Sequence, residues 1–209
     1  MRETASLMSG KEKHAEERRD EPIRTFICIE IPEGLKTRIA ALQRELKQID
    51  SQVSWVKPDN IHLTLKFLGP VAQSRIAEVQ QGVERAASSC SPFEVEVAST
   101  GCFPSPRGPR VLWVGLSRLT TQLRQLHQAI EDELSPSGFA RESKPFSPHL
   151  TIGRVRSPRG AAEVAERLVA RGFDAHKFSA SQIIVMRSDL HPSGSVYTPQ
   201  AVIQLGPQS

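Results

Sequence analysis

Long apolar runs, aromatic side chains and pairable cysteines are all scarce in this sequence. No run of about eighteen apolar residues occurs, so the chain offers no candidate for a membrane-spanning helix. The N-terminal residues are polar, and we expect no secretory signal there. The three cysteines, Cys28, Cys90 and Cys102, are odd in number and lack Cys-x-x-Cys spacing. They argue against a disulfide framework and a cysteine zinc site, and they favour a reducing, cytoplasmic setting.

The overall amino-acid composition predicts a folded, mildly basic chain. Of the 209 residues, 38% are hydrophobic and 24% are charged, which fits one domain or two small lobes. The formal net charge is +4, and residues 101–160 carry nine basic and four acidic side chains. This segment therefore accounts for the whole basic excess. It indicates an anionic partner, and a solvated basic surface is the alternative.

The first residues differ in composition from the rest of the chain. Residues 1–22 mix both charges and contain few apolar side chains. They cannot bury enough apolar surface to offset the entropy lost on ordering, so we predict a disordered polar tail. Residues 23–207 are then expected to form a single bilobal domain.

Hydrophobic periodicity predicts both helices and strands in this domain. Apolar residues spaced by three and four predict helices near 35–49, 76–83, 119–134 and 164–169. Short apolar or alternating runs predict strands near 25–31, 61–68, 93–97, 110–116, 149–155, 178–187 and 197–205.

The order of the predicted elements repeats. A helix, a strand, a helix and two strands occur twice, and matching elements begin 84 to 87 residues apart, at 34 and 118, 62 and 149, 93 and 178, and 110 and 197. We infer an α+β fold of two pseudo-symmetric lobes related by an approximate two-fold axis. An accidental recurrence of a common element order is the alternative.

Both copies carry the same short motif at the same place. The first is His62-Leu-Thr64-Leu and the second is His149-Leu-Thr151-Ile. Side chains alternate along a strand, so each histidine shares a face with its threonine while the apolar residues point to the core. Two polar pairs facing solvent are the alternative, although a duplicated position is hard to explain that way.

Two such motifs on opposite walls of one cleft suit phosphoryl transfer. Imidazole takes or gives a proton near neutral pH, and two imidazoles flanking one centre act as base and acid in the same displacement. The two hydroxyls beside them donate to non-bridging oxygens. This scheme requires no metal and no cofactor.

These residues resemble a known family. The sequence is similar to the 2H phosphoesterase superfamily, specifically the RNA 2′,3′-cyclic phosphodiesterases, also called 2′-5′ RNA ligases. The matching segments are Arg24-Thr-Phe26, 55–69 (WVKPDNIHLTLKFLG), Phe103-Pro104 with 110–115 (RVLWVG), Gly138-Phe139 with 148–154 (PHLTIGR), and Gly194-Ser-Val-Tyr197. The resemblance covers about residues 23–205. It implies two antiparallel sheets with helices on their outer faces and an active-site cleft between them.

The resemblance also implies roles for individual residues. His149 would be the proton acceptor and His62 the proton donor, although the near-symmetry leaves the opposite assignment open. Thr64 and Thr151 would bind the phosphate.

Two basic residues are further candidates for substrate binding. Arg154 matches a basic family residue that contacts phosphate, but by strict alternation it faces away from His149 unless the strand bends at Gly153. Lys66 shares a face with His62 by alternation and would help to neutralise the phosphate. A solvent-exposed strand lysine is the alternative.

The expected activity is metal-independent hydrolysis of RNA 2′,3′-cyclic phosphate ends to 2′-phosphates. ATP-independent 2′-5′ ligation is the related reaction with a 5′-hydroxyl as nucleophile, and no P-loop motif occurs that would support an ATP-dependent one. The expected partner is RNA with a cyclic phosphate end, such as tRNA halves, and we expect a monomer that contacts no membrane. A phosphodiesterase acting on a small cyclic nucleotide and a non-catalytic nucleotide-binding module are the alternatives.

Trp55 and Trp113 are candidates for stacking on a base, with core packing favoured for Trp113.

Overall fold

The computed structural model describes residues 20–192 and 194–206. The strands are β1 (Ile23–Glu30), β2 (Val53–Trp55), β3 (His62–Val71), β4 (Phe93–Phe103), β5 (Val111–Leu116), β6 (His149–Val155), β7 (His176–Ala180), β8 (Gln182–His191) and β9 (Gly194–Gln204). The helices are α2 (Glu33–Leu46), α3 (Ile76–Ser88), α4 (Thr121–Leu134) and α5 (Ala161–Arg171), with 3-10 turns η1 (Pro58–Asn60) and η2 (Gln73–Arg75). None of the described helices is long and apolar enough to cross a membrane.

The predicted polar tail falls mostly outside the described residues, which begin at Asp20. Asp20 accepts hydrogen bonds from the backbone N–H and the hydroxyl of Ser74, at 3.1 and 2.6 Å. The end of the predicted tail is therefore fixed to η2 just before β1 begins.

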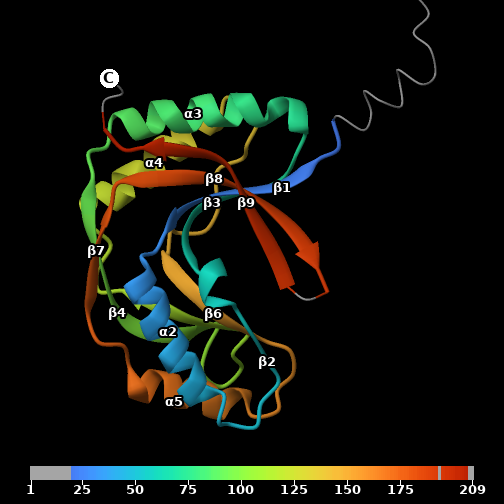
Figure 1. The fold of residues 1–209 in the computed structure, drawn as a ribbon, viewed down its shortest axis with the longest axis vertical. Helices are drawn as coiled ribbons and strands as arrows, with labels where there is room; N and C mark the ends of the chain where they lie inside the picture. The colour runs from blue at the N-terminus through green and yellow to red at the C-terminus, as the bar shows by residue number, and fades with distance from the viewer. Residues whose placement is uncertain (1–19, 193, 207–209) are drawn as a thin grey trace, which may run out of the picture.

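The strands form one antiparallel sheet whose order is symmetric about its centre. The order is β7-β4-β5-β6-β3-β1-β8-β9, with β2 added on β6. The first lobe contains β3, β1, β8 and β9 with α3 and α4 packed on them, and the second contains β6, β5, β4 and β7 with α2 and α5 (Figure 1). Leu63 of β3 and Leu150 of β6 are the one residue pair that joins β3 to β6 in the described chain. The predicted α+β class and the two pseudo-symmetric lobes are confirmed, and the two expected antiparallel sheets are the two halves of this one sheet.

The sheet order corrects how the repeat was divided. The sequence pattern matched the strand at 110 with the strand at 197, but the order makes β5 equivalent to β1 and β4 equivalent to β8. In addition, the predicted strand at 178–187 is two strands, β7 and β8, and β2 was not predicted. The order divides the chain into repeats that run from β1 to β4 and from β5 to β8. In this division β4 pairs with β5 and β8 pairs with β1, each a strand of the other repeat, and local periodicity carries no information about such long-range partners.

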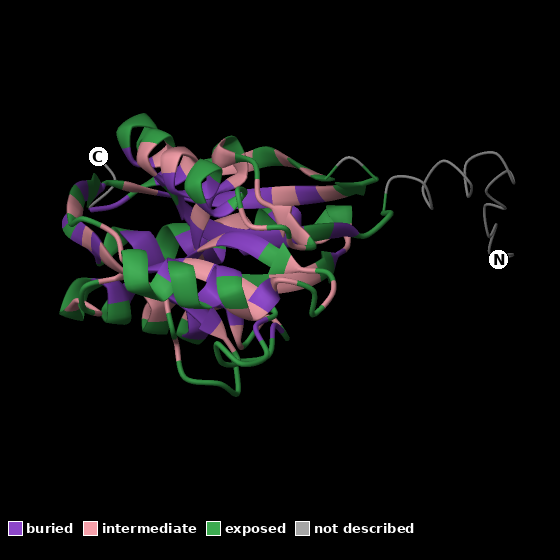
Figure 2. Ribbon diagram, turned by 90° about the horizontal axis from the view of Figure 1, so that it is seen from below, coloured by how far each residue is buried: buried purple, intermediate pink, exposed green. Residues whose placement is uncertain are grey.

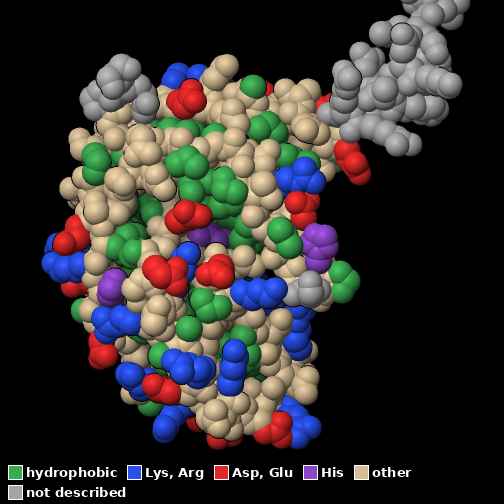
Figure 3. Space-filling model, viewed as in Figure 1, with side chains coloured by type: hydrophobic (Ala, Val, Ile, Leu, Met, Phe, Trp, Pro, Cys, Tyr) green, Lys and Arg blue, Asp and Glu red, His purple; other side chains and the backbone are tan. Residues whose placement is uncertain are grey.

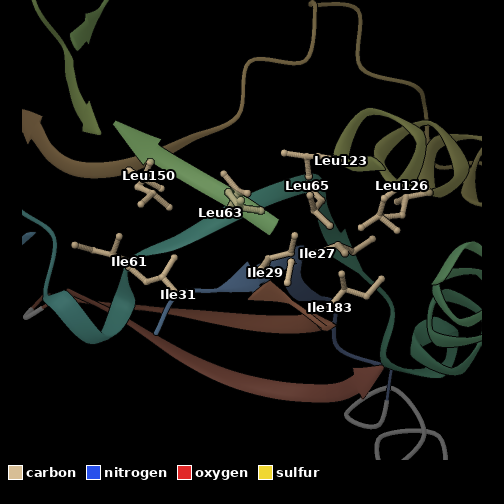
Figure 4. Packing of buried hydrophobic residues seen from close by; sticks show 14 of the residues in the cluster. Ile27, Ile29, Ile31, Ile61, Leu63, Leu65, Leu123, Leu126, Leu150 and Ile183 are labelled. Atoms are coloured by element: carbon tan, nitrogen blue, oxygen red, sulfur yellow. The ribbon is translucent and has the colours of Figure 1, made fainter. Parts of the chain in front are cut away.

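The core lies between the sheet and the helices. Leu63 and Leu150 point into it from the two motif strands, and Leu65 meets Leu123 and Leu126 of α4 (Figure 4). All five side chains are at most 1% exposed. Figure 2 shows buried residues along the central strands and exposed residues on the outer faces of the helices. Because the leucines of β3 and β6 occupy the face toward the helices, the polar side chains of both strands lie on the opposite face.

Candidate active site

The pairing of β3 with β6 gathers the two predicted motifs into one cluster. Leu63 lies opposite Leu150 in an antiparallel pair, so His62 lies across from Thr151, and Thr64 lies across from His149. All four point to the face opposite the leucines, which we call the histidine face. On this face the two histidines are diagonal neighbours, a relation that separates Cα atoms by about 7–8 Å in a regular pair.

His62 is held by aromatic rings and by one backbone carbonyl. Its ring stacks on Phe26 with centroids 4.6 Å apart, and Tyr197 meets it edge-on at 5.3 Å. Nδ1 donates to the carbonyl oxygen of Asn60 at 2.9 Å. The side chain of Asn60 in turn donates to the carbonyl of Ser195 at 2.7 Å, which ties η1 to β9. Since a carbonyl only accepts, Nδ1 carries a proton and Nε2 is left for chemistry.

His149 has the same arrangement in the second lobe. Its Nδ1 donates to the carbonyl of Ser147 at 2.8 Å, which again leaves Nε2 available. The rings of Phe103 and Trp113 lie 5.1 and 6.4 Å away. Both histidines are therefore oriented by the carbonyl of the second residue before them.

The position of Trp113 corrects an expectation. Core packing was favoured for it, but Trp113 is the cross-strand partner of Thr151 and lies on the histidine face. Its ring lies over two glycines: a Cβ at Gly101 or Gly115 would approach ring atoms to 2.3 and 2.8 Å. Trp55 instead packs against the hydrophobic core. Glycines on neighbouring strands thus make room for one large ring beside His149.

Both imidazoles have lowered pKa values. Burial is the main cause for His62 and lowers its pKa to about 4, against the opposing hydrogen bond to Asn60, and the positive charge of Arg154 lowers it further. The pKa of His149 is lowered in the same way, by burial first, with Ser147 opposing and Arg154 adding to the effect. Both rings are therefore neutral at pH 7 in the free protein, and Arg154 acts on both.

We expect NMR titration of the histidine ring protons to show His62 titrating near pH 4. Substituting Arg154→Met should raise the pKa of His62 and of His149, because a nearby positive charge that disfavours imidazolium is removed. His127 is the internal control, since burial lowers its pKa without any contribution from Arg154. An unchanged titration of both motif histidines in the variant would contradict this placement of the guanidinium.

A β-bulge explains how Arg154 reaches the histidine face. In the register of β5 with β6, Trp113 pairs with Thr151 and Leu112 pairs with Gly153, so one residue of β6 is extra. The bulge reverses the alternation, and the exposed Arg154 falls on the face of His149. A Cβ at Gly153 would lie 2.9 Å from Cγ1 of Val53, so any larger residue at this position would have to displace Val53 of β2. The bend at Gly153 on which the prediction for Arg154 depended is therefore present.

The equivalent bulge in β3 overturns the prediction for Lys66. Cys28 pairs with Thr64 and Ile27 pairs with Lys66, so the alternation reverses here too, and Lys66 turns into the core. It is 1% exposed, and its Nζ donates to both carboxylate oxygens of Glu131, at 2.7 and 2.8 Å, and to the carbonyl of Ala140 at 2.8 Å. Lys66 is neither a phosphate ligand nor a solvent-exposed lysine. It links β3 to α4 and to the segment that leads into β6.

Sequence reasoning missed two buried polar residues that hold the bulges. Gln43 of α2 donates to the carbonyl oxygens of Ile152 and Val56, both at 2.8 Å, and Glu131 of α4 accepts from Lys66. Each is the eleventh residue of its helix, at matching places in the two repeats. Each of the two residues is polar but lies in the apolar stripe of its helix, and this feature of the sequence could have revealed them.

The distribution of charge differs between the lobes. Arg154 and Arg156 follow the second motif, and both are exposed. Nη2 of Arg156 donates to the hydroxyl of Ser54 at 3.4 Å. On the face shown in Figure 3, Lys and Arg side chains gather over the lower half of the molecule, where α2 and α5 lie. Those charges lie on the helix side of the sheet, so it is Arg154, on the histidine face, that suits the second lobe to hold the anionic part of a ligand.

The chain matches one family model and several named proteins from other organisms. A family model described as the 2′-5′ RNA ligase superfamily matches residues 31–192. A protein of Methanothermobacter thermautotrophicus named RNA 2′,3′-cyclic phosphodiesterase is 33% identical over 184 residues, which are 88% of this chain and 99% of the relative. A protein of Thermotoga maritima with the same name is 32% identical over 176 residues, which are 84% of this chain and 91% of the relative.

Solved structures show the same fold. The chain superposes on a protein of Thermus thermophilus with a TM-score of 0.72 and 23% identity, covering 89% of this chain and 100% of the other. Escherichia coli LigT in apo form gives a TM-score of 0.71 with 23% identity, covering 89% of this chain and 99% of the other.

Proposed function

This chain belongs to the 2′-5′ RNA ligase superfamily, and we propose that it hydrolyses RNA 2′,3′-cyclic phosphate ends to 2′-phosphates. Relatives about 30% identical over nearly their whole lengths are named RNA 2′,3′-cyclic phosphodiesterase. The observation that carries the proposal is the Leu63–Leu150 pair, which gathers two imidazoles and two threonines on one face.

The reaction is an in-line displacement at phosphorus. A water oxygen bonds to phosphorus while the bond from phosphorus to the ribose O3′ breaks, so the phosphate stays on O2′. His149 takes the proton of the attacking water, and His62 gives a proton to the departing O3′. The hydroxyls of Thr64 and Thr151 and the guanidinium of Arg154 donate to the non-bridging oxygens, on which charge gathers in the transition state.

The environments of the two rings suit these roles. A neutral His149 at pH 7 accepts a proton directly, as a base must. The low pKa of His62 makes its protonated form a strong acid. An anionic phosphate bound beside it favours that protonated form, because opposite charges stabilise each other.

The same geometry supports ligation without ATP. A ribose 5′-hydroxyl that replaces water as the nucleophile forms a bond to phosphorus while O3′ leaves, and the product is a 2′-5′ linkage. His149 and His62 would act on the new nucleophile and on O3′ as in hydrolysis.

The proposal is tested by incubating the wild-type protein with adenosine 2′,3′-cyclic phosphate in excess EDTA and separating the products by chromatography. We expect the 2′-phosphate to form at an undiminished rate, because every proposed role is filled by a side chain. A 3′-phosphate product or loss of turnover in the chelator would contradict the mechanism. Tight binding with no product over hours would instead support the binding module.

Substrate size distinguishes RNA from a small metabolite. A short oligonucleotide with a 2′,3′-cyclic phosphate end should have a higher kcat/KM than the mononucleotide, because the exposed Arg156, which follows the end of β6 two residues after Arg154, can contact a further phosphate. The gain should decrease as salt is raised. Equal kcat/KM values for both substrates would favour a small cyclic nucleotide as the substrate.

A further inference from the structure

Gln43 of α2 holds the backbone of the bulge in β6. In the register with β5, Ile152 is the extra residue of this bulge. Its carbonyl oxygen accepts from the backbone N–H of Val56 at 3.0 Å and from Nε2 of Gln43 at 2.8 Å. The same Nε2 also donates to the carbonyl oxygen of Val56, the residue after β2, at 2.8 Å. One amide therefore joins the helix, the end of β2 and the bulge.

The amide of Gln43 lies on the side of the sheet away from the histidine face. The residue is 2% exposed and belongs to the apolar stripe of α2. Both of its partners are carbonyl oxygens, so the place requires a donor, which a carboxylate or an apolar side chain does not supply. Gln43 does not reach a ligand on the histidine face, and its influence on the chemistry passes through the backbone of β6.

The first lobe uses different groups at the equivalent positions. Gly153 and Lys66 each follow their motif histidine by four residues. Gln43 and Glu131 are each the eleventh residue of their helix. In the first lobe the lysine side chain reaches the carboxylate. In the second lobe the glycine has no side chain, and the neutral amide bonds to the strand backbone directly. Gln43 is therefore the more closely tied of the two to the course of its strand.

The course of β6 at Ile152 decides where Arg154 points. Without the bulge, alternation would turn Arg154 away from His149, and with it the guanidinium lies on the histidine face. We propose that Gln43 is a positioning residue, whose two hydrogen bonds hold the bulge in the form that keeps Arg154 beside His62 and His149. The part of this inference that concerns phosphate rests on the proposed phosphodiesterase function.

The first test measures the position of Arg154 without any substrate. Gln43→Met keeps the length of the side chain and removes the donor, so the backbone at the bulge is held less firmly. We expect NMR titration to show higher pKa values for both His62 and His149, as in Arg154→Met, because the guanidinium spends less time near the rings.

Gln80→Met is the matched control for this titration. Gln80 of α3 donates to the carbonyl of Gln200 at 3.1 Å, and Gln200 is the extra residue of a bulge in β9. The contact is of the same kind, but no motif residue follows this bulge. We expect the pKa values of both motif histidines to stay at their wild-type values in Gln80→Met.

The second test measures catalysis in two backgrounds. Gln43→Met should lower kcat/KM for adenosine 2′,3′-cyclic phosphate by about 10- to 100-fold, since a misplaced contact to the phosphate costs that much. In the Arg154→Met background the same substitution should cost less than about threefold, because the contact it disturbs is already gone. If Gln43→Met does not fold, Gln43→Asn, which withdraws the amide by one methylene group, replaces it in both tests.

The outcomes separate this inference from the function on which it rests. A wild-type protein that hydrolyses no cyclic phosphate overturns the proposed function, while the titration still decides whether Gln43 positions Arg154. Unchanged pKa values in a folded Gln43 variant overturn the inference. An equal loss of kcat/KM with and without Arg154 also overturns it, because the amide would then support the fold in general.

Discussion

Substituting either His149→Ala or His62→Ala should lower kcat for hydrolysis of a 2′,3′-cyclic phosphate by about 10²- to 10⁴-fold. Each variant removes one of the two proton transfers, while the other imidazole, the two threonine hydroxyls and Arg154 remain. The double variant should be little slower than the worse single one, since residues that act in one displacement are not additive. His191→Ala is the control, because His191 is an exposed histidine at the end of β8. Full activity in either motif variant would refute the site.

The pH dependence of kcat/KM assigns the two roles. The rate should fall at low pH as the base becomes protonated and at high pH as the acid loses its proton. Both pKa values lie below 6.5 in the free protein, so the optimum should also lie below pH 6.5. If His62 is the acid, His62→Ala should lose the alkaline limb, and His149→Ala should lose the acidic limb. The reverse pattern would exchange the roles, and an optimum above pH 7 would contradict the lowered pKa values.

Breaking the buried pair of Lys66 and Glu131 should strongly destabilise the fold. Either Lys66→Met or Glu131→Leu should lower the free energy of unfolding by about 3–5 kcal/mol, because the remaining charge is left buried without its partner. The two side chains are 1% and 3% exposed, so water does not replace the lost contact. The double variant, with two apolar side chains, should recover most of the loss. Denaturant unfolding of the wild type, the two single variants and the double variant gives the free energies of unfolding for this double-mutant cycle.

A surface ion pair provides the matched control. The Arg85–Glu133 pair has the same 2.7 Å separation, but its side chains are 57% and 36% exposed. Arg85→Met should therefore cost less than about 1 kcal/mol. A similarly small loss for Lys66→Met would show that Lys66 and Glu131 are not a buried pair in solution.

The local pattern around each motif was sufficient to predict which polar side chains share a face. Alternation along a strand places His62 with Thr64, and His149 with Thr151, whatever the strands pair with, as long as no bulge intervenes. The register of β1 and β5 shows that none does within those four positions. The duplication in the sequence then indicated two matched halves, and the sheet order confirms them.

Prediction by alternation failed one step past the first motif. Alternation placed Lys66 beside the phosphate, and the bulge in β3 turns it into the core instead. The same device in β6 brings Arg154 to the histidines. Gly153 indicated the bend in β6, but the sequence of β3 did not reveal its bulge, because a bulge forms only where the partner strand has one residue fewer.

By itself, the sequence singled out the side chains that are proposed to carry out the chemistry, since motif composition and strand periodicity are local properties. Tertiary structure alone decided which of the following residues join them. The neighbouring strands β1 and β5 set the register, and Gln43 and Glu131 reach the bulges from helices 109 and 65 residues away in the chain. Hydrogen bonds across such separations exist only once each lobe has folded, so no local pattern records them.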